Sequence, residues 1–196
     1  MKSWEIVAMI LDKAVSQMEA ARNRGLRADE LTVFHAKKLP TITIHDYMGR
    51  LQQFSCCSEA CFVLAFIYID RVLQKNPSFP LGSLCIHRLI LACLMIAIKF
   101  NDDIYYDNAF YAKIGGISVN EMNILEISLL SLTQFDLYVK DQVFSDYSNE
   151  LLSHTIEQEK PLSPQIMEDC GKGSVPQIGS SASIDTVPSY GELKET

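Results

Sequence analysis

Two charged residues occur in segments that otherwise resemble hydrophobic core. Lys99 follows an uninterrupted apolar run, and Glu126 lies inside the helical pattern EMNILEISLLSL. On a helix Met122 and Leu125 belong to one apolar stripe, and Glu126 lies on or beside that stripe. An unpaired buried charge is strongly destabilising, so each of these residues requires a partner. They can form an ion pair with each other, or they can hold a groove ready for another protein.

A second pair of charged residues, Asp70 and Arg71, follows the apolar stretch FVLAFIYI. One interpretation is a helix that emerges into solvent at this point. The other is a structural ion pair between Asp70 and Arg50 on the preceding helix. The residues themselves leave both interpretations open.

No pattern of catalytic or cofactor-binding residues is present. The Gly115-Gly116 pair lacks the surrounding residues of a phosphate-binding loop. Cys56, Cys57 and Cys61 lack the paired spacing of a zinc site, and we interpret them as buried thiols. We therefore predict a protein without catalytic residues, bound metal or cofactor.

Acidic residues cluster at Asp102, Asp103 and Asp107. Such a cluster can in principle bind a metal ion, but helix capping and solvation of a loop are the simpler interpretation. Across the whole chain of 196 residues, 48% are hydrophobic, 21% are charged, and the net charge is -7. This acidic balance without a basic patch predicts no nucleic-acid partner.

The chain's hydrophobic segments predict no membrane partner. The apolar run before Lys99 is too short to span a bilayer, and the first residues resemble an amphipathic helix rather than a signal peptide. Together with the cysteines in apolar segments, this predicts a location in the cytoplasm, the nucleus or both.

Helical periodicity dominates the chain, which predicts an all-α fold. Thr43 is a predicted N-cap, and Ser118 with Glu121 forms a predicted capping box. Gly115-Gly116 suits a helix C-terminus. The predicted helices span residues 3–22, 45–54, 58–76, 84–100 and 108–114, with another that begins at Ser118 and one more at 140–154.

The last part of the chain has a different composition. From about residue 155, Gly, Ser, Pro and acidic residues dominate, and periodicity is lost, which predicts a disordered acidic tail. Ser163, followed by Pro164, is a candidate phosphorylation site there. We divide the chain into an N-terminal amphipathic helix (1–30), a central domain (31–139), a C-terminal helix (140–154) and the tail (155–196).

The central domain resembles a known family. The sequences LAFIYIDRVL, HRLILACLMIAIKFNDDIYYDNAFYAKIGGIS and NEMNILEISLLSL resemble the cyclin box of the P-type, U-type or PHO-related cyclins. The resemblance implies a single five-helix cyclin box around a central third helix. Its five helices would span residues 44–54, 58–76, 84–101, 106–114 and 118–133. The resemblance also implies that the aspartate of IDR, Asp70, pairs with an arginine at the start of the first box helix. That arginine is missing here, and Arg50 on the same helix is its substitute.

The resemblance also implies a partner and its binding residues. Cyclins use a lysine at the end of the third box helix and a glutamate on the fifth to bind a cyclin-dependent kinase. Lys99 and Glu126 match these two residues. Asp102, Asp103 and Tyr105 are further candidate kinase-binding residues. The expected function is therefore that of a regulatory subunit forming a heterodimer with the kinase, in cell-cycle or nutrient signalling. The alternative is a cyclin-fold adaptor that does not activate a kinase.

Overall fold

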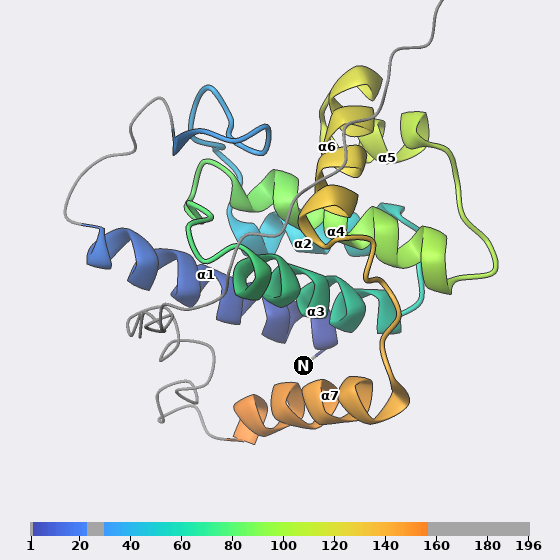
Figure 1. Cartoon of the computed structure of the whole chain (residues 1–196). Helices are drawn as coiled ribbons and strands as arrows, with labels where there is room; N and C mark the ends of the chain where they lie inside the picture. Colours follow the sequence, from blue (N-terminus) through green and yellow to red (C-terminus); the bar gives the residue numbers. More distant parts are fainter. Residues whose placement is uncertain (1, 23–29, 157–196) are drawn as a thin grey trace, which may run out of the picture. The chain divides into compact units, whose positions relative to one another are not determined.

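The computed structural model describes residues 2–22 and 30–156. Within these ranges the chain forms helices joined by turns and loops and contains no β-strand, so the all-α prediction is confirmed. Figure 1 shows the helices in chain order: α1 (Ser3–Ala21), α2 (Ile44–Phe54), α3 (Ala60–Lys75), α4 (Ile86–Asn101), α5 (Asn108–Gly115), α6 (Val119–Leu132) and α7 (Asp141–Ile156).

Helix α4 is the central helix, as predicted. It packs against α2, α3, α5 and α6, and its most extensive contact is with α3 (Figure 1). Apolar side chains surround the helix from Leu89 to Ile98, all of them buried. Burial on every side explains why this segment lacks the polar face of a surface helix. Lys99 is therefore at the point where the central helix leaves the core.

Helix α1 packs on the same core through one apolar face. It contacts α2, α3 and α7, and this face consists of Trp4, Ile6, Val7, Ala8, Ile10, Leu11 and Val15. The N-terminal amphipathic helix therefore packs on the central domain. Among the described helices none is long and apolar enough to cross a membrane.

Local capping sets the helix ends near the candidate site. The side chains of Thr43 and Asp107 accept hydrogen bonds from the backbone N–H groups of Asp46 (3.0 Å) and Phe110 (2.9 Å). Gly116 ends α5 with a φ of 73°, a conformation that favours glycine. These features confirm the predicted caps at Thr43 and after Gly115.

The predicted capping box at the start of α6 forms only in part. The Ser118 hydroxyl accepts a hydrogen bond from the Glu121 backbone N–H at 3.1 Å. The Glu121 carboxylate, however, accepts from Arg88 Nε at 2.6 Å instead of turning back to the cap. A charged partner on α4 competes with the backbone N–H for this carboxylate, because charge-assisted hydrogen bonds are the stronger ones.

The predicted ion pair between Asp70 and Arg50 is wrong. Asp70 is buried, and its carboxylate accepts hydrogen bonds from Gln74 Nε2 (2.7 Å) and from the Tyr147 hydroxyl on α7. Arg50 is exposed on α2. Helix α7, which lies outside the predicted box, supplies the partner that the resemblance placed on the first box helix.

Arg71 is bound to the backbone of a distant segment. Its guanidinium donates to the carbonyls of Asp136 (2.7 Å) and Tyr138 (2.9 Å). Lys75, one turn further along α3, donates to the carbonyl of Thr133 at 2.8 Å. These bonds fasten the segment between α6 and α7 to α3.

Some predicted boundaries and burial states differ from the structure. Helix α3 begins at Ala60 rather than 58, because Ser58 is held outside the helix by Asp102. Helix α7 continues to Ile156, beyond the predicted end at 154. Cys61 is buried as predicted, whereas Cys56 is exposed. Most of the predicted tail, with Ser163, lies outside the described residues.

Candidate protein-binding site

Lys99 and Glu126 meet at the surface where the end of α4 lies against α6. The Lys99 Nζ atom lies 2.7 Å from Glu126 Oε1. Both side chains are partly exposed, at 26% and 23%. The ion pair, one of the two alternatives that the sequence leaves open, is therefore present in the structure. Partial exposure also leaves their polar atoms within reach of another molecule.

Asn108, which sequence reasoning did not single out, completes this arrangement. Its Oδ1 accepts from Lys99 Nζ at 2.5 Å, and its Nδ2 donates to Glu126 Oε2 at 2.7 Å. The same Nδ2 donates to Asn123 Oδ1 at 2.7 Å. The only sequence signal was the place of Asn108 and Asn123 inside the motifs that carry the cyclin resemblance. We call Lys99, Asn108, Asn123 and Glu126 the polar network.

The polar network retains hydrogen-bonding capacity. A lysine ammonium has three N–H donors, and Lys99 directs them to two partners. Each Glu126 oxygen accepts one bond in the network and has a further lone pair. One donor and two acceptor positions are therefore left for a ligand, a set that matches the C=O and N–H groups of a polypeptide main chain.

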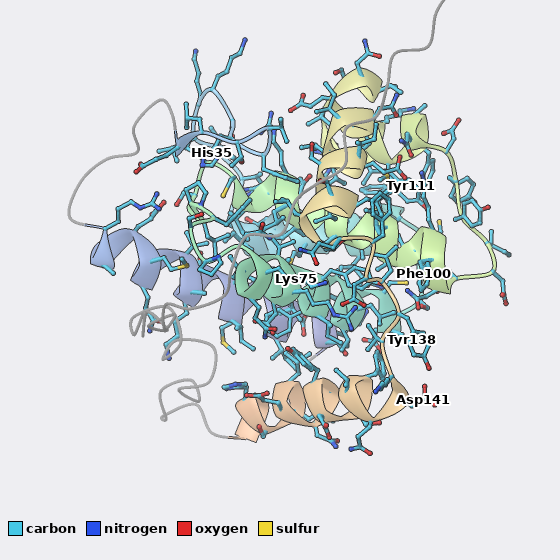
Figure 2. All side chains as sticks on the ribbon, viewed as in Figure 1. His35, Lys75, Phe100, Tyr111, Tyr138 and Asp141 are labelled. Carbon is cyan, nitrogen blue, oxygen red and sulfur yellow. The ribbon has the colours of Figure 1, made fainter. Side chains whose placement is uncertain are left out.

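Exposed apolar side chains accompany the polar network. Phe100 directly follows Lys99, and Figure 2 shows it where α4 ends. Ile127 directly follows Glu126 and is 68% exposed. Ile104, in the segment between α4 and α5, is exposed as well. Large exposed apolar residues beside polar groups are typical of a protein-binding surface.

The other candidate residues follow Lys99 in the segment between α4 and α5. Asp103 and Tyr105 are exposed there. Asp102 instead accepts from the Ser58 hydroxyl (2.6 Å) and the Ser58 backbone N–H (3.0 Å). Asp102 therefore links the end of α4 to the start of α3, while Asp103 and Tyr105 lie open to solvent.

Neither a metal site in the acidic cluster nor the surface pockets contribute to this candidate site among the described residues. The described residues contain no group of three or more His, Cys, Asp or Glu residues that could bind a metal ion. Asp107 caps α5. Two surface pockets of about 680 and 580 Å³ lie elsewhere, the larger beside Tyr47 and His87, and neither is lined by Lys99 or Glu126.

Comparison with known proteins agrees with this geometry. The sequence pattern of the family described as Cyclin matches residues 8–137, so the match begins within α1. Cyclin-U4-1 of Arabidopsis thaliana is 39% identical over 145 residues, covering 74% of this chain and 72% of the relative. Cyclin-P3-1 of Oryza sativa subsp. japonica is 37% identical over 180 residues, covering 92% and 75%. The chain therefore belongs to the cyclin family, among the P-type and U-type cyclins.

Proposed function

We propose that this protein is a non-catalytic regulatory subunit that binds and activates a cyclin-dependent Ser/Thr protein kinase. Membership of the cyclin family supports a regulatory role. The observation that carries the proposal is the ion pair of Lys99 and Glu126 at the surface, with unused hydrogen-bonding capacity and exposed apolar neighbours.

The mechanism depends on the αC helix of the kinase. A protein kinase is active only when a glutamate of αC pairs with the lysine of strand β3. A rigid helical surface that binds αC in its inward position therefore selects the active state. In this arrangement Lys99 donates to a main-chain carbonyl beside αC, and Glu126 accepts from a main-chain N–H. Phe100 and Ile127 bury apolar surface against the kinase.

The loop after α4 faces the activation segment of the kinase in this proposal. Asp103 and Tyr105, both exposed, are available to it. The Asp103 carboxylate would meet the arginine cluster that normally receives a phosphate. Asp102 contributes less directly, because it is less exposed than Asp103 and each of its carboxylate oxygens already accepts one hydrogen bond from Ser58. If Asp103→Asn supports full kinase activity, this part of the proposal is wrong.

The cellular context follows from the resemblance and is part of the proposal. The complex would phosphorylate serine or threonine residues that precede proline, in cell-cycle or phosphate signalling, in the cytoplasm or the nucleus. Ser163 with Pro164 would be one such target within the chain itself. Replacing Ser163 with alanine and mapping phosphorylated residues after incubation with the kinase tests that assignment.

Affinity capture followed by a kinase assay tests the main proposal. The parent chain should recover a cyclin-dependent kinase and stimulate its activity on a peptide with a Ser-Pro site. Lys99→Ala and Glu126→Ala should each lose most of the bound kinase, whereas Lys113→Ala, at an exposed position on α5, should not. Full binding by both site variants contradicts the proposal. A stable complex without stimulation supports the adaptor alternative.

A further inference from the structure

We propose that Asn108 is a positioning residue, whose side-chain amide holds Lys99 and Glu126 in the orientation in which they bind the kinase main chain. This inference rests on the proposed function. It adds a third residue, on a third helix, to a site otherwise described by two charges.

The orientation of the Asn108 amide follows from the chemistry of its neighbours. Lysine is only a donor and an ionised carboxylate only an acceptor. The amide oxygen must therefore face Lys99 and the amide nitrogen must face Glu126. The second N–H of the nitrogen is used by Asn123. Both side-chain N–H donors of Asn108 are thus engaged. In a flipped amide, the nitrogen would face the donor Lys99 and the oxygen would face the acceptor Glu126.

Asn108 also fixes the positions of the Lys99 and Glu126 side chains relative to α5. It is the first residue of α5, and the Asp107 cap fixes the start of that helix. Buried Tyr111, Ala112 and Ile114 hold α5 against the core. A short side chain on a rigid helix start thereby restrains two long, flexible side chains. An exposed ion pair alone provides little restraint, because ordering both side chains costs nearly what their attraction provides.

Removal of the amide should change the site without changing the fold. Asn108 donates and accepts only side-chain bonds in the polar network, while Asp107 supplies the cap. Alanine is a better helix former than asparagine at such a position. The remaining Lys99 and Glu126 side chains would still attract each other, but they would sample several orientations.

Two variants test the inference with the kinase recovered by the parent chain. Asn108→Ala should lower kinase affinity about tenfold, the effect of losing roughly one polar interaction. It should lower the melting temperature only slightly, because water can reach the partly exposed Lys99 and Glu126 side chains. Asn120→Ala is the matched control, because it makes the same substitution at an exposed position of α6 outside the polar network. It should change the affinity far less.

Asn108→Asp provides a readout that a purely structural role would not change. The new carboxylate would face Glu126 on α6 and Lys99 on α4, with Asp107 beside it in the chain. The carboxylate would repel Glu126 and compete with Glu126 for Lys99, and both effects should weaken kinase binding at neutral pH. At lower pH the new carboxyl group becomes protonated and can donate to Glu126, so binding by Asn108→Asp should recover relative to Asn108→Ala.

The outcomes separate the two proposals. If Lys99→Ala keeps full kinase binding, the proposed function fails. If Lys99→Ala loses binding while Asn108→Ala keeps full affinity, only the positioning role of Asn108 is wrong. The positioning role is also contradicted if Asn108→Asp and Asn108→Ala show the same affinity at every pH.

Discussion

The Tyr147 hydroxyl donates a hydrogen bond to the buried Asp70 carboxylate and thereby joins α7 to α3. Gln74 Nε2 donates to the same oxygen at 2.7 Å. Burial raises the pKa of Asp70, and the bond from Tyr147 partly opposes this effect. The aspartate of the IDR motif is therefore satisfied by a helix that follows the cyclin box.

Removal of the Tyr147 hydroxyl should destabilise the protein. Tyr147→Phe keeps the ring but leaves Asp70 with one fewer donor, and hydrogen bonds to charged groups contribute about 1.5–3 kcal/mol. The loss should appear as a lower free energy of unfolding in urea. Tyr138→Phe is the control, because Tyr138 is exposed, and it should leave that free energy unchanged. Equal stability of both variants would contradict the role of the bond.

Asp70 should make stability depend on pH. Its pKa in the folded protein is raised above the ordinary 3.8, so the folded state holds this proton more tightly than the unfolded state. The contribution of Asp70 to stability is therefore largest at low pH and decreases as pH rises through the raised pKa. In urea unfolding, the stability of the parent relative to Asp70→Asn should fall as the pH is raised from about 4 to about 7. A rise would contradict the assignment.

Local sequence patterns predicted the helices and their caps well. Periodicity located α2 to within one residue of its observed start and identified α4 as the central helix. The caps at Thr43 and Gly116 were predicted because capping depends on neighbouring residues. The proximity of Lys99 and Glu126 was also predicted, since two charges at the edge of one core need partners.

Contacts between distant segments were less predictable. Asp70 bonds a residue 77 positions further along the chain, and nothing in the local pattern of α7 marks Tyr147 as its partner. Asn108 is an uncharged residue at a helix start, so no burial cost draws attention to it. The Glu121 carboxylate does not form the predicted capping bond, because the fold brings Arg88 close to it.

Gly115 should not tolerate a side chain. A Cβ atom there would lie 2.2 Å from Leu91 Cδ2, so Gly115→Ala should cost about 1–3 kcal/mol through overpacking. The combined variant with Leu91→Ala should lose less stability than the two single variants together, because the smaller side chain removes the clash. Gly116→Ala meets open space and should show only the cost of a side chain at positive φ, about 1–2 kcal/mol, without coupling to Leu91. Additive losses at Gly115 and Leu91 in urea unfolding would contradict the clash.

The cysteines should differ in reactivity. Hydrogen bonds from the Cys61 thiol and the Ser55 hydroxyl lower the pKa of Cys57, which favours the reactive thiolate. Burial raises the pKa of Cys85 to about 11 and that of Cys93 well above its ordinary value. In a Cys170→Ser background, a thiol reagent should label Cys57 and exposed Cys56 in the native protein. Rapid native labelling of Cys93 would contradict this order.

The turn after α6 exposes an aromatic residue in an unfavourable backbone conformation. Gln134 and Phe135 have φ values of 55° and 58°, in the left-handed region that non-glycine residues seldom adopt. Phe135 is 72% exposed. The bonds from Arg71 and Lys75 hold the carbonyls on either side of this pair. Strain that is maintained by such bonds and exposes a large apolar side chain is typical of a functional site.

Phe135→Gly should therefore separate kinase binding from stability. Glycine adopts the left-handed conformation without strain, and this gain offsets the extra backbone freedom of the unfolded chain, so the free energy of unfolding in urea should change by less than about 1 kcal/mol. If the proposed kinase-binding surface extends from Glu126 along α6 to this turn, affinity for the kinase recovered by the parent chain should fall in a titration, because an exposed aromatic side chain is lost. Leu39→Gly, at an exposed position outside the helices, is the control and should leave kinase binding intact. Unchanged affinity of Phe135→Gly would exclude this turn from the kinase-binding surface.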